Sequence, residues 1–144
     1  DMIVKLEFYD FVVGQISHSE KEEEVKKRVK IETRDTTRVQ YNNYVAKLKT
    51  YTDKVYSSGR LDVKIIEFDG SKIRLNDRVH GSFTWINDYA IFAGDKEALN
   101  KEQLELTKRK VAPMPPGQDL FIEFTKPIYD QLTGKLNRFF KKYN

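Results

Sequence analysis

The chain has 144 residues, of which 39% are hydrophobic and 33% charged, with a formal net charge of +4 at pH 7. Typical domains run to ~100–150 residues, so residues 1–144 are predicted to form a single domain. Its many aromatic residues favour a globular over a disordered chain. Cysteine is absent, which excludes disulfides, zinc ribbons and thiol catalysis. No apolar run approaches the ~20 residues of a membrane-spanning helix, and the composition is compatible with the cytoplasm or the nucleus.

The N-terminal region is predicted to be strand. Residues 2–16 are expected to form a strand in two parts, with a bulge or bend at Gly14. The residues expected to be buried in it are Ile3, Leu6, Phe8, Phe11 and Val13. Residues 18–27 show no periodicity and favour a solvated connection over a short charged helix, whereas 25–33 alternate as a strand does.

Residues 38–56 match two patterns. Their apolar side chains, from Tyr41 to Val55, fall at helical spacing, and Ser57–Gly59 would end such a helix. The same segment is rich in Tyr, Thr and Val, which strands prefer. We expect a helix here.

The middle of the chain predicts an antiparallel meander. Asp69-Gly70 indicates a hairpin, because glycine readily adopts a positive φ. Further turns are expected at Asn76-Asp77 and Asn87-Asp88. The four short strands so defined are 61–68, 71–75, 78–86 and 89–93.

The C-terminal third is predicted to be helical. Asp95 is expected to cap a helix over 96–111. Residues 112–118 form a Pro-rich connector to a C-terminal helical segment, 119–143. The apolar stripe of that segment comprises Ile128, Leu132, Leu136 and Phe139 or Phe140, and breaks are expected near Pro127 and Gly134.

The stretch Leu75–Gly81 (LNDRVHG) resembles the L-x-x-G-D-x-V-x-G phrase of OB-fold barrels, with Asn76 where glycine usually stands. The resemblance covers residues 10–93 and implies an antiparallel β-barrel. A curved sheet wrapped on a helix, as in cystatin-like or NTF2-like domains, uses the same ingredients, and a helix at 38–56 would favour it. The predicted fold class is α+β, an antiparallel meander or barrel with two or three helices, the last at the C-terminus.

Catalytic chemistry is disfavoured. His80 lies in VHGSFT, which resembles one half of the two-histidine phosphoesterase signature, and such an enzyme needs a second half. His18-Ser19-Glu20 is the other candidate, within a charged stretch. A phosphoesterase is therefore a minor alternative. Neither metal-ligand spacing nor a phosphate-binding glycine loop is present, so no catalytic residue, metal or cofactor is predicted.

Binding to single-stranded DNA or RNA is the first functional prediction. Cations follow phosphates and aromatic rings stack on bases, and the meander interleaves the two residue types. A half-exposed sheet alternates in the same way without any ligand. The predicted nucleic-acid-binding residues are Lys64, Lys72, Arg74, Arg78, Phe83 and Trp85.

A protein-interaction or assembly module is the alternative prediction. It rests on the aromatic residues of the C-terminal helical segment, which either docks on its own sheet, the more ordinary outcome, or contacts a protein partner. The predicted partner-binding residues are Phe121, Phe124, Phe139 and Phe140.

Overall fold

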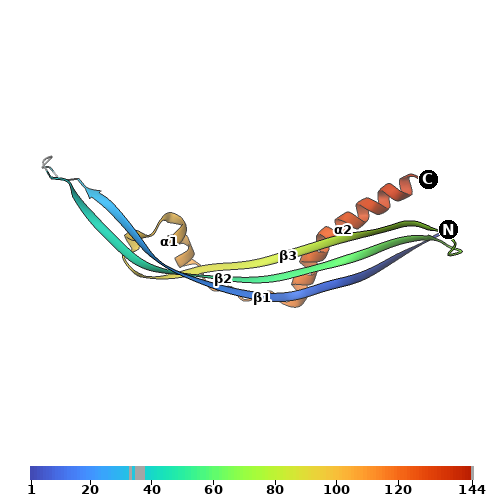
Figure 1. The fold of residues 1–144 in the computed structure, drawn as a ribbon, viewed down its shortest axis with the longest axis horizontal. Helices are drawn as coiled ribbons and strands as arrows, with labels where there is room; N and C mark the ends of the chain where they lie inside the picture. The colour runs from blue at the N-terminus through green and yellow to red at the C-terminus, as the bar shows by residue number, and fades with distance from the viewer. Residues whose placement is uncertain (33, 35–37, 144) are drawn as a thin grey trace. The chain divides into compact units, whose positions relative to one another are not determined.

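The computed structural model describes residues 1–32, 34 and 38–143. The fold is α+β: a three-stranded antiparallel sheet in the order β1-β2-β3, followed by helices of which the last is C-terminal (Figure 1). The strands are β1 (Met2–Ile31), β2 (Gln40–Glu67) and β3 (Ile73–Gly94). The helical elements are the 3-10 turn η1 (Lys96–Ala98), α1 (Lys101–Lys108) and α2 (Gly117–Lys141). The predicted class, antiparallel sheet and C-terminal helix are confirmed.

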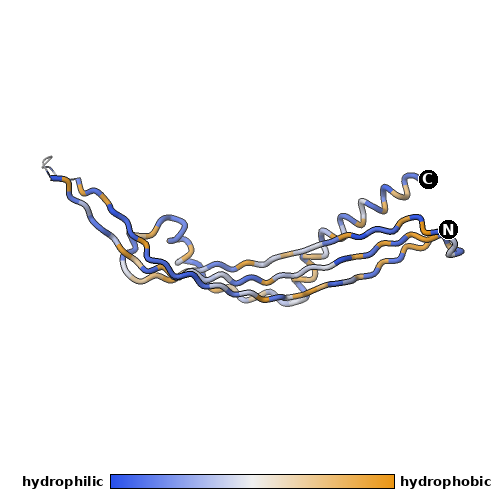
Figure 2. The backbone as a smooth tube through the Cα atoms, viewed as in Figure 1, coloured by the Kyte–Doolittle hydropathy of each residue, from blue (hydrophilic) through white to orange (hydrophobic). Residues whose placement is uncertain are grey.

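The sheet order leaves β1 and β3 as the two edges, so the closure that a barrel requires is not seen among the described residues. Figure 2 shows hydrophobic and hydrophilic positions alternating along the strands, as expected where successive side chains point to opposite faces. Within the described part of the chain, no helix combines the length and apolar character that a membrane crossing needs.

The chain forms two compact units, to each of which every strand contributes a part. Unit 1 comprises Asp1–Ile16, Val55–Trp85 and Met114–Asn144, and unit 2 comprises Ser17–Lys54 and Ile86–Pro113. Each unit has its own cluster of buried apolar side chains.

Three local predictions are wrong because strand pairing continues through them. Residues 18–27 lie within β1, and 38–56 lie largely within β2. The turns expected at Asn76-Asp77 and Asn87-Asp88 are absent, since β3 runs through both pairs. Thr33, at the end of the predicted strand 25–33, lies outside the described residues.

The hairpin between β2 and β3 is confirmed. The Glu67 amide donates to the Lys72 carbonyl at 3.0 Å, and Gly70 has a φ of 74°. The Asp69 carboxylate accepts the Ser71 amide at 2.9 Å, and its bonds with Ser71 lower the pKa of Asp69. Local side-chain chemistry therefore fixes this turn.

The core of unit 1 lies between α2 and the strands β2 and β3. Its buried members are Leu61, Val63, Val79, Phe124 and Ile128. Leu132 and Leu136 pack against this cluster, so the predicted apolar stripe of α2 is confirmed. The expected breaks at Pro127 and Gly134 are wrong, because α2 is continuous. Phe124 and Ile128 flank Pro127 on the buried side, and their packing offsets the amide bond that proline cannot make.

The core of unit 2 is built by β2, β3 and the segment that follows β3. It comprises Ala46, Leu48, Ala90, Ala98 and Leu99. The predicted helix 96–111 is shorter than expected: α1 begins after Asn100, which forms a capping box with Gln103. Asp95 makes no side-chain cap and instead accepts the Val45 amide at 3.0 Å.

Candidate binding groove on unit 1

The first part of β1 is apolar and exposed. Every residue that the sequence predicted to be buried here is more than a third exposed: Ile3, Leu6, Phe8, Phe11 and Val13. That prediction is wrong because the core of unit 1 is formed by α2 with β2 and β3, and β1 contributes none of its buried members. Val4 and Tyr9 are exposed as well, so residues 2–9 present apolar side chains on both faces of an edge strand.

The backbone of β1 departs from regular strand conformation at Asp10, as it also does at Gly14, where the sequence predicts a bulge or bend. Asp10 has a φ of 47°, a left-handed conformation that non-glycine residues adopt rarely. The Arg60 guanidinium lies 5.2 Å from the Tyr9 ring centroid and 3.2 Å from an Asp10 carboxylate oxygen. The Arg60 side chain thus contacts two successive residues of β1. Gly14 also has a positive φ, of 82°.

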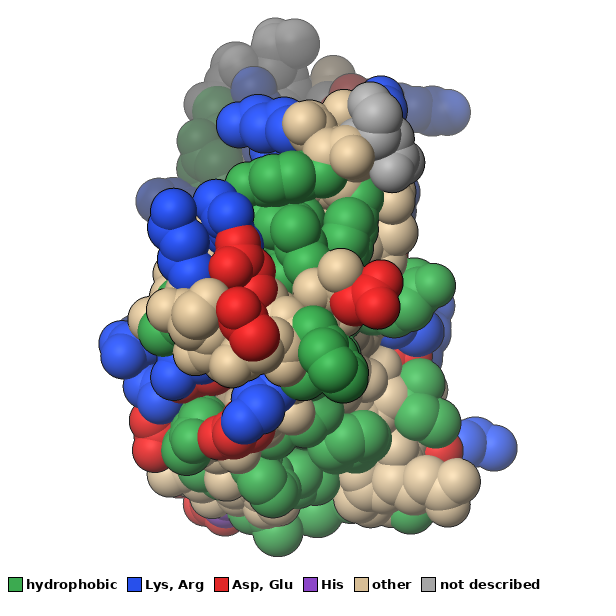
Figure 3. Space-filling view, turned by 90° about the vertical axis from the view of Figure 1, so that its right-hand side faces the viewer, with side chains coloured by type: hydrophobic (Ala, Val, Ile, Leu, Met, Phe, Trp, Pro, Cys, Tyr) green, Lys and Arg blue, Asp and Glu red, His purple; other side chains and the backbone are tan. Residues whose placement is uncertain are grey.

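A groove runs between this part of β1 and α2. Its volume is about 690 Å³. We call it the β1–α2 groove, and its lining residues are Leu6, Phe8, Leu61, Phe121, Ile122, Thr125, Lys126, Ile128, Tyr129, Asp130 and Leu132. The Phe8 and Phe121 ring centroids are 6.2 Å apart. Figure 3, which faces the side that carries both chain termini in Figure 1, shows hydrophobic side chains at the surface among charged ones.

Two glycines set the position of α2. A Cβ atom on Gly81 would lie 2.3 Å from the Phe124 carbonyl oxygen, and one on Gly59 would lie 2.8 Å from the Phe124 ring. The helix backbone therefore approaches β3 at Gly81, and the Phe124 ring approaches β2 at Gly59, more closely than any other residue would allow. This contact draws α2 over β2 and β3 and leaves the side of β1 uncovered, which opens the groove.

Polar contacts hold α2 on β3 further along. The Gln131 side chain donates to the His80 carbonyl at 2.8 Å, and Lys135 donates to the Asp77 carboxylate. The bond from Lys135 lowers the pKa of Asp77. On the face of β1 opposite to the groove, the Tyr9 hydroxyl donates to Glu7, which raises the pKa of Tyr9.

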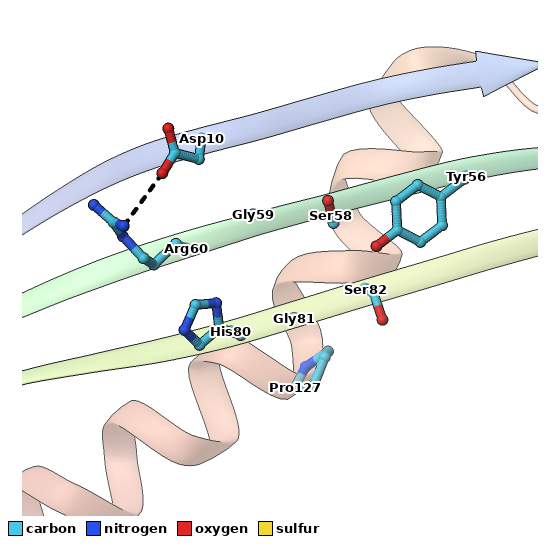
Figure 4. Close-up of a pocket in the computed structure, with 9 residues that line it drawn as sticks. All are labelled: Asp10, Tyr56, Ser58, Gly59, Arg60, His80, Gly81, Ser82 and Pro127. Atoms are coloured by element: carbon cyan, nitrogen blue, oxygen red, sulfur yellow. Dashed lines mark ion pairs between the residues drawn. The ribbon is translucent and has the colours of Figure 1, made fainter.

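A second, polar depression of about 490 Å³ lies in unit 1 around His80 (Figure 4). His80 and Ser82 come from β3, Arg60 from β2 and Asp10 from β1, and the Arg60–Asp10 ion pair lies beside the imidazole in the view. The depression contains one histidine, whereas phosphoesterase chemistry of the predicted type needs two.

His18, the other histidine, belongs to unit 2. Its Nδ1 bonds to Asp53 and its Nε2 lies 3.2 Å from Glu20. These bonds, that to Asp53 above all, raise the pKa of His18. The phosphoesterase alternative gains no support, because carboxylates engage both ring nitrogens. Among the described residues, no group of three or more His, Asp or Glu side chains is arranged to hold a metal ion.

Carboxylates engage two of the predicted nucleic-acid-binding cations. Arg74 Nε donates to Glu67 at 2.6 Å, and Arg78 Nε lies 3.9 Å from Asp62. A phosphate would have to compete with Glu67 for the Arg74 guanidinium, whereas the Arg78 side chain is 64% exposed and its contact with Asp62 is too long for a hydrogen bond.

The other predicted nucleic-acid-binding residues are spread over different positions of unit 1. Phe83 packs against the core beneath α2, and strand alternation places Trp85 on the same face. Lys64 is exposed between two fully buried neighbours, so it faces away from that core. Lys72 lies in the hairpin turn just before β3. The structure therefore does not interleave these rings and cations on one face.

The predicted partner-binding aromatics also separate. Phe121 is 41% exposed and lines the groove, whereas Phe124 is fully buried in the core. Phe139 is buried and stacks edge-on against Phe140, with centroids 5.1 Å apart. The segment thus docks on its own sheet and still presents Phe121 to solvent.

Sequence reasoning missed Leu6 and Phe8 as candidate binding residues. The available signal was the succession of apolar residues at both odd and even positions of 2–9, because a strand with one solvated face shows a single apolar face. No family model, curated protein or solved structure matches the chain.

Proposed function

We propose that this protein is an interaction module that binds another protein chain through residues 2–9 of β1 and the β1–α2 groove. The observation that carries the proposal is the uncovered apolar strand: its side chains are exposed on both faces, and it lies at the edge of the sheet. Contiguous apolar surface of this kind marks interaction sites in folded proteins.

The geometry favours the addition of a strand. An edge strand presents unpaired amide and carbonyl groups, which an extended segment of a partner pairs with. Alternate side chains of the added strand would point toward the groove, where Phe8 and Phe121 provide an apolar wall. Main-chain bonds would supply part of the affinity, and the groove would select apolar side chains.

Single-stranded nucleic-acid binding and the OB-like resemblance stay predictions. The bond of Arg74 to Glu67 and the placement of Phe83 give the nucleic-acid prediction less support than the groove gives to a protein partner. Binding of labelled oligonucleotides that weakens with salt and is lost in Arg74→Glu would favour the nucleic-acid function instead.

The proposed function is tested with a photo-crosslinking amino acid at position 8 of the full chain in its native cellular setting. A protein adduct is expected at position 8 and not at position 101, on the exposed side of α1. The protein so identified is then purified and titrated against the wild type. We expect Leu6→Asp to weaken its binding about tenfold or more, since it places a charge in the apolar contact, and Ser82→Asp to leave it unchanged.

Absence of any protein adduct at position 8 would refute the proposal. An adduct whose affinity is the same for the wild type and Leu6→Asp would refute it as well. Because Leu6 is about half exposed, Leu6→Asp should unfold at a temperature close to that of the wild type, and a thermal scan checks this.

A further inference from the structure

Backbone bonding shows which residues of β1 are available to a new strand. The Phe68 amide donates to the Asp1 carbonyl at 3.0 Å, so the backbone of Asp1 points toward β2. In an antiparallel ladder the direction alternates from residue to residue. The amide and carbonyl groups of Val4, Leu6 and Phe8 therefore point away from β2, toward the free edge.

The free edge is uninterrupted from Met2 to Tyr9. This stretch contains neither proline nor glycine, and its charged residues are Lys5 and Glu7. The left-handed conformation of Asp10, with a φ of 47°, interrupts the regular strand backbone there. A new strand would thus pair with residues 2–9.

We propose that β1 pairs antiparallel with β1 of a second copy of this chain, with Leu6 opposite Leu6. The inference rests on the proposed function and names the partner. A two-fold axis perpendicular to the sheet relates such strands and passes midway between the two copies of one residue, and the outward-pointing backbone of Leu6 allows a reciprocal pair of hydrogen bonds there.

Charge complementarity selects this register. Centred on Leu6, it places Lys5 of each copy opposite Glu7 of the other, which forms two ion pairs by symmetry. A register centred on Lys5 places the two lysines opposite one another. A register centred on Glu7 places the two glutamates opposite one another. Like charges directly opposite are destabilising in a sheet, whereas opposite charges stabilise it.

The apolar side chains match in the same register. Val4 lies opposite Phe8, and Ile3 opposite Tyr9, so each apolar side chain of residues 3–9 meets another. Because the axis is perpendicular to the sheet, α2 of both copies lies on the same face. The side chains of Leu6 and Phe8 from the second copy therefore lie next to the β1–α2 groove of the first.

The area is sufficient for a stable pair. Eight apolar side chains, between 37% and 68% exposed, surround the contact: Ile3, Val4, Leu6, Phe8, Tyr9, Phe121, Ile122 and Tyr129. A fully buried aromatic side chain covers ~150–250 Å², so the four partly exposed aromatic ones offer roughly 80 Å² each and the four aliphatic ones less, at most about 640 Å² per copy. The pair would bury at most roughly 1,300 Å², at the lower end of the ~1,200–2,000 Å² of specific interfaces.

Charge swaps test the register by sedimentation equilibrium of the full chain. Lys5→Glu and Glu7→Lys each place like charges opposite one another twice, and each is expected to weaken the dimer about tenfold or more. The double variant should restore it, and an equimolar mixture of the two single variants should form the mixed dimer. Lys101→Glu, a reversal on α1, is the control and should leave the dimer unchanged. A dimer that neither single variant weakens would overturn the register.

Cysteine substitution tests the same pairing independently, since the natural chain has no cysteine. Leu6→Cys should form a disulfide-linked dimer on mild oxidation, because directly opposite residues have Cα atoms ~5.5 Å apart. Val4→Cys alone should not, because its two copies would be roughly 14 Å apart at ~3.4 Å per residue. A mixture of Val4→Cys and Phe8→Cys should link.

The outcomes separate this inference from the proposed function. A wild type that is monomeric throughout the concentration range, with no linkage of Leu6→Cys, would overturn the self-pairing. The proposed function would still stand if position 8 crosslinks to a different protein whose binding Leu6→Asp weakens. If position 8 crosslinks to no protein, the function and the self-pairing both fail.

Discussion

Replacement of Gly81 by alanine tests the close contact between α2 and β3, on which the groove depends. The added Cβ would lie 2.3 Å from the Phe124 carbonyl oxygen and 2.7 Å from Ile128 Cγ1. The nearest atom belongs to the helix backbone, so a change of side-chain rotamer cannot relieve the clash. Gly81 lies in regular strand, where alanine by itself would be favoured by ~0.5–1 kcal/mol. Any loss of stability therefore reports the contact with α2.

Overpacking of this kind costs ~1–3 kcal/mol, so after the conformational gain we expect Gly81→Ala to lower the free energy of unfolding by about 1–2 kcal/mol. Gly134→Ala is the matched control. It makes the same chemical change within α2, where the added Cβ meets nothing within 4 Å, and it should stabilise the protein by ~0.5–1 kcal/mol.

Urea unfolding measures both variants, followed by the fluorescence of Trp85, the only tryptophan, and by far-UV circular dichroism. Opposite signs for the two alanines are expected. If Gly81→Ala is as stable as the wild type, α2 does not rest on β3 at this point, and the groove beside it would lose its structural basis.

Two further predictions concern unit 2. Asp53 and Glu20 raise the pKa of His18, so the stability that they contribute is complete below about pH 6.5 and is lost as the pH rises through the folded pKa. The thermal midpoint of the wild type should therefore fall over this pH interval. If the midpoint of His18→Gln falls with pH in the same way, the assignment to His18 is contradicted. Asn100→Ala removes the side-chain acceptor of the Gln103 amide and should cost ~1 kcal/mol in urea unfolding, whereas Lys101→Ala next to it should have little effect.

The hairpin and the stripe of α2 were predictable because local chemistry determines both. Asp69 and Gly70 supply a side-chain acceptor and a positive φ within the turn itself. The stripe repeats at helical spacing and needs a single apolar surface to pack on, which the core of unit 1 provides.

The long strands were not predictable because their patterns change along the chain. In β2 the buried positions are even-numbered at Ala46 and Leu48 and odd-numbered from Val55 onward. Because the buried positions change from even to odd numbers, the two-residue period of a strand is hidden in the sequence. The combined pattern of apolar residues fits helical spacing by coincidence. Residues 18–27 bury almost nothing, so backbone pairing with β2 alone makes them a strand.

The candidate site was predictable only in part, since sequence shows that a residue is apolar but not what covers it. Phe121 and Phe124 are both aromatic members of α2, and the approach of the helix at Gly59 and Gly81 decides that Phe124 is buried while Phe121 is not. The same approach decides that Leu6 is left exposed. Burial in unit 1 thus follows from where α2 can come close to the sheet.

The close contact of α2 with β3 and the free edge of β1 contribute separately to the proposed pairing. Gly81→Ala displaces one wall of the groove but leaves Lys5, Glu7 and the outward-pointing backbone of Leu6 in place. It should therefore weaken the dimer only through side-chain contacts, and the disulfide of Leu6→Cys should still form in its presence. Lys5→Glu should act in the opposite way, with the dimer weakened and the stability of the monomer unchanged. A Gly81→Ala background that abolishes the linkage of Leu6→Cys would show that the groove, rather than the free edge, determines the pairing.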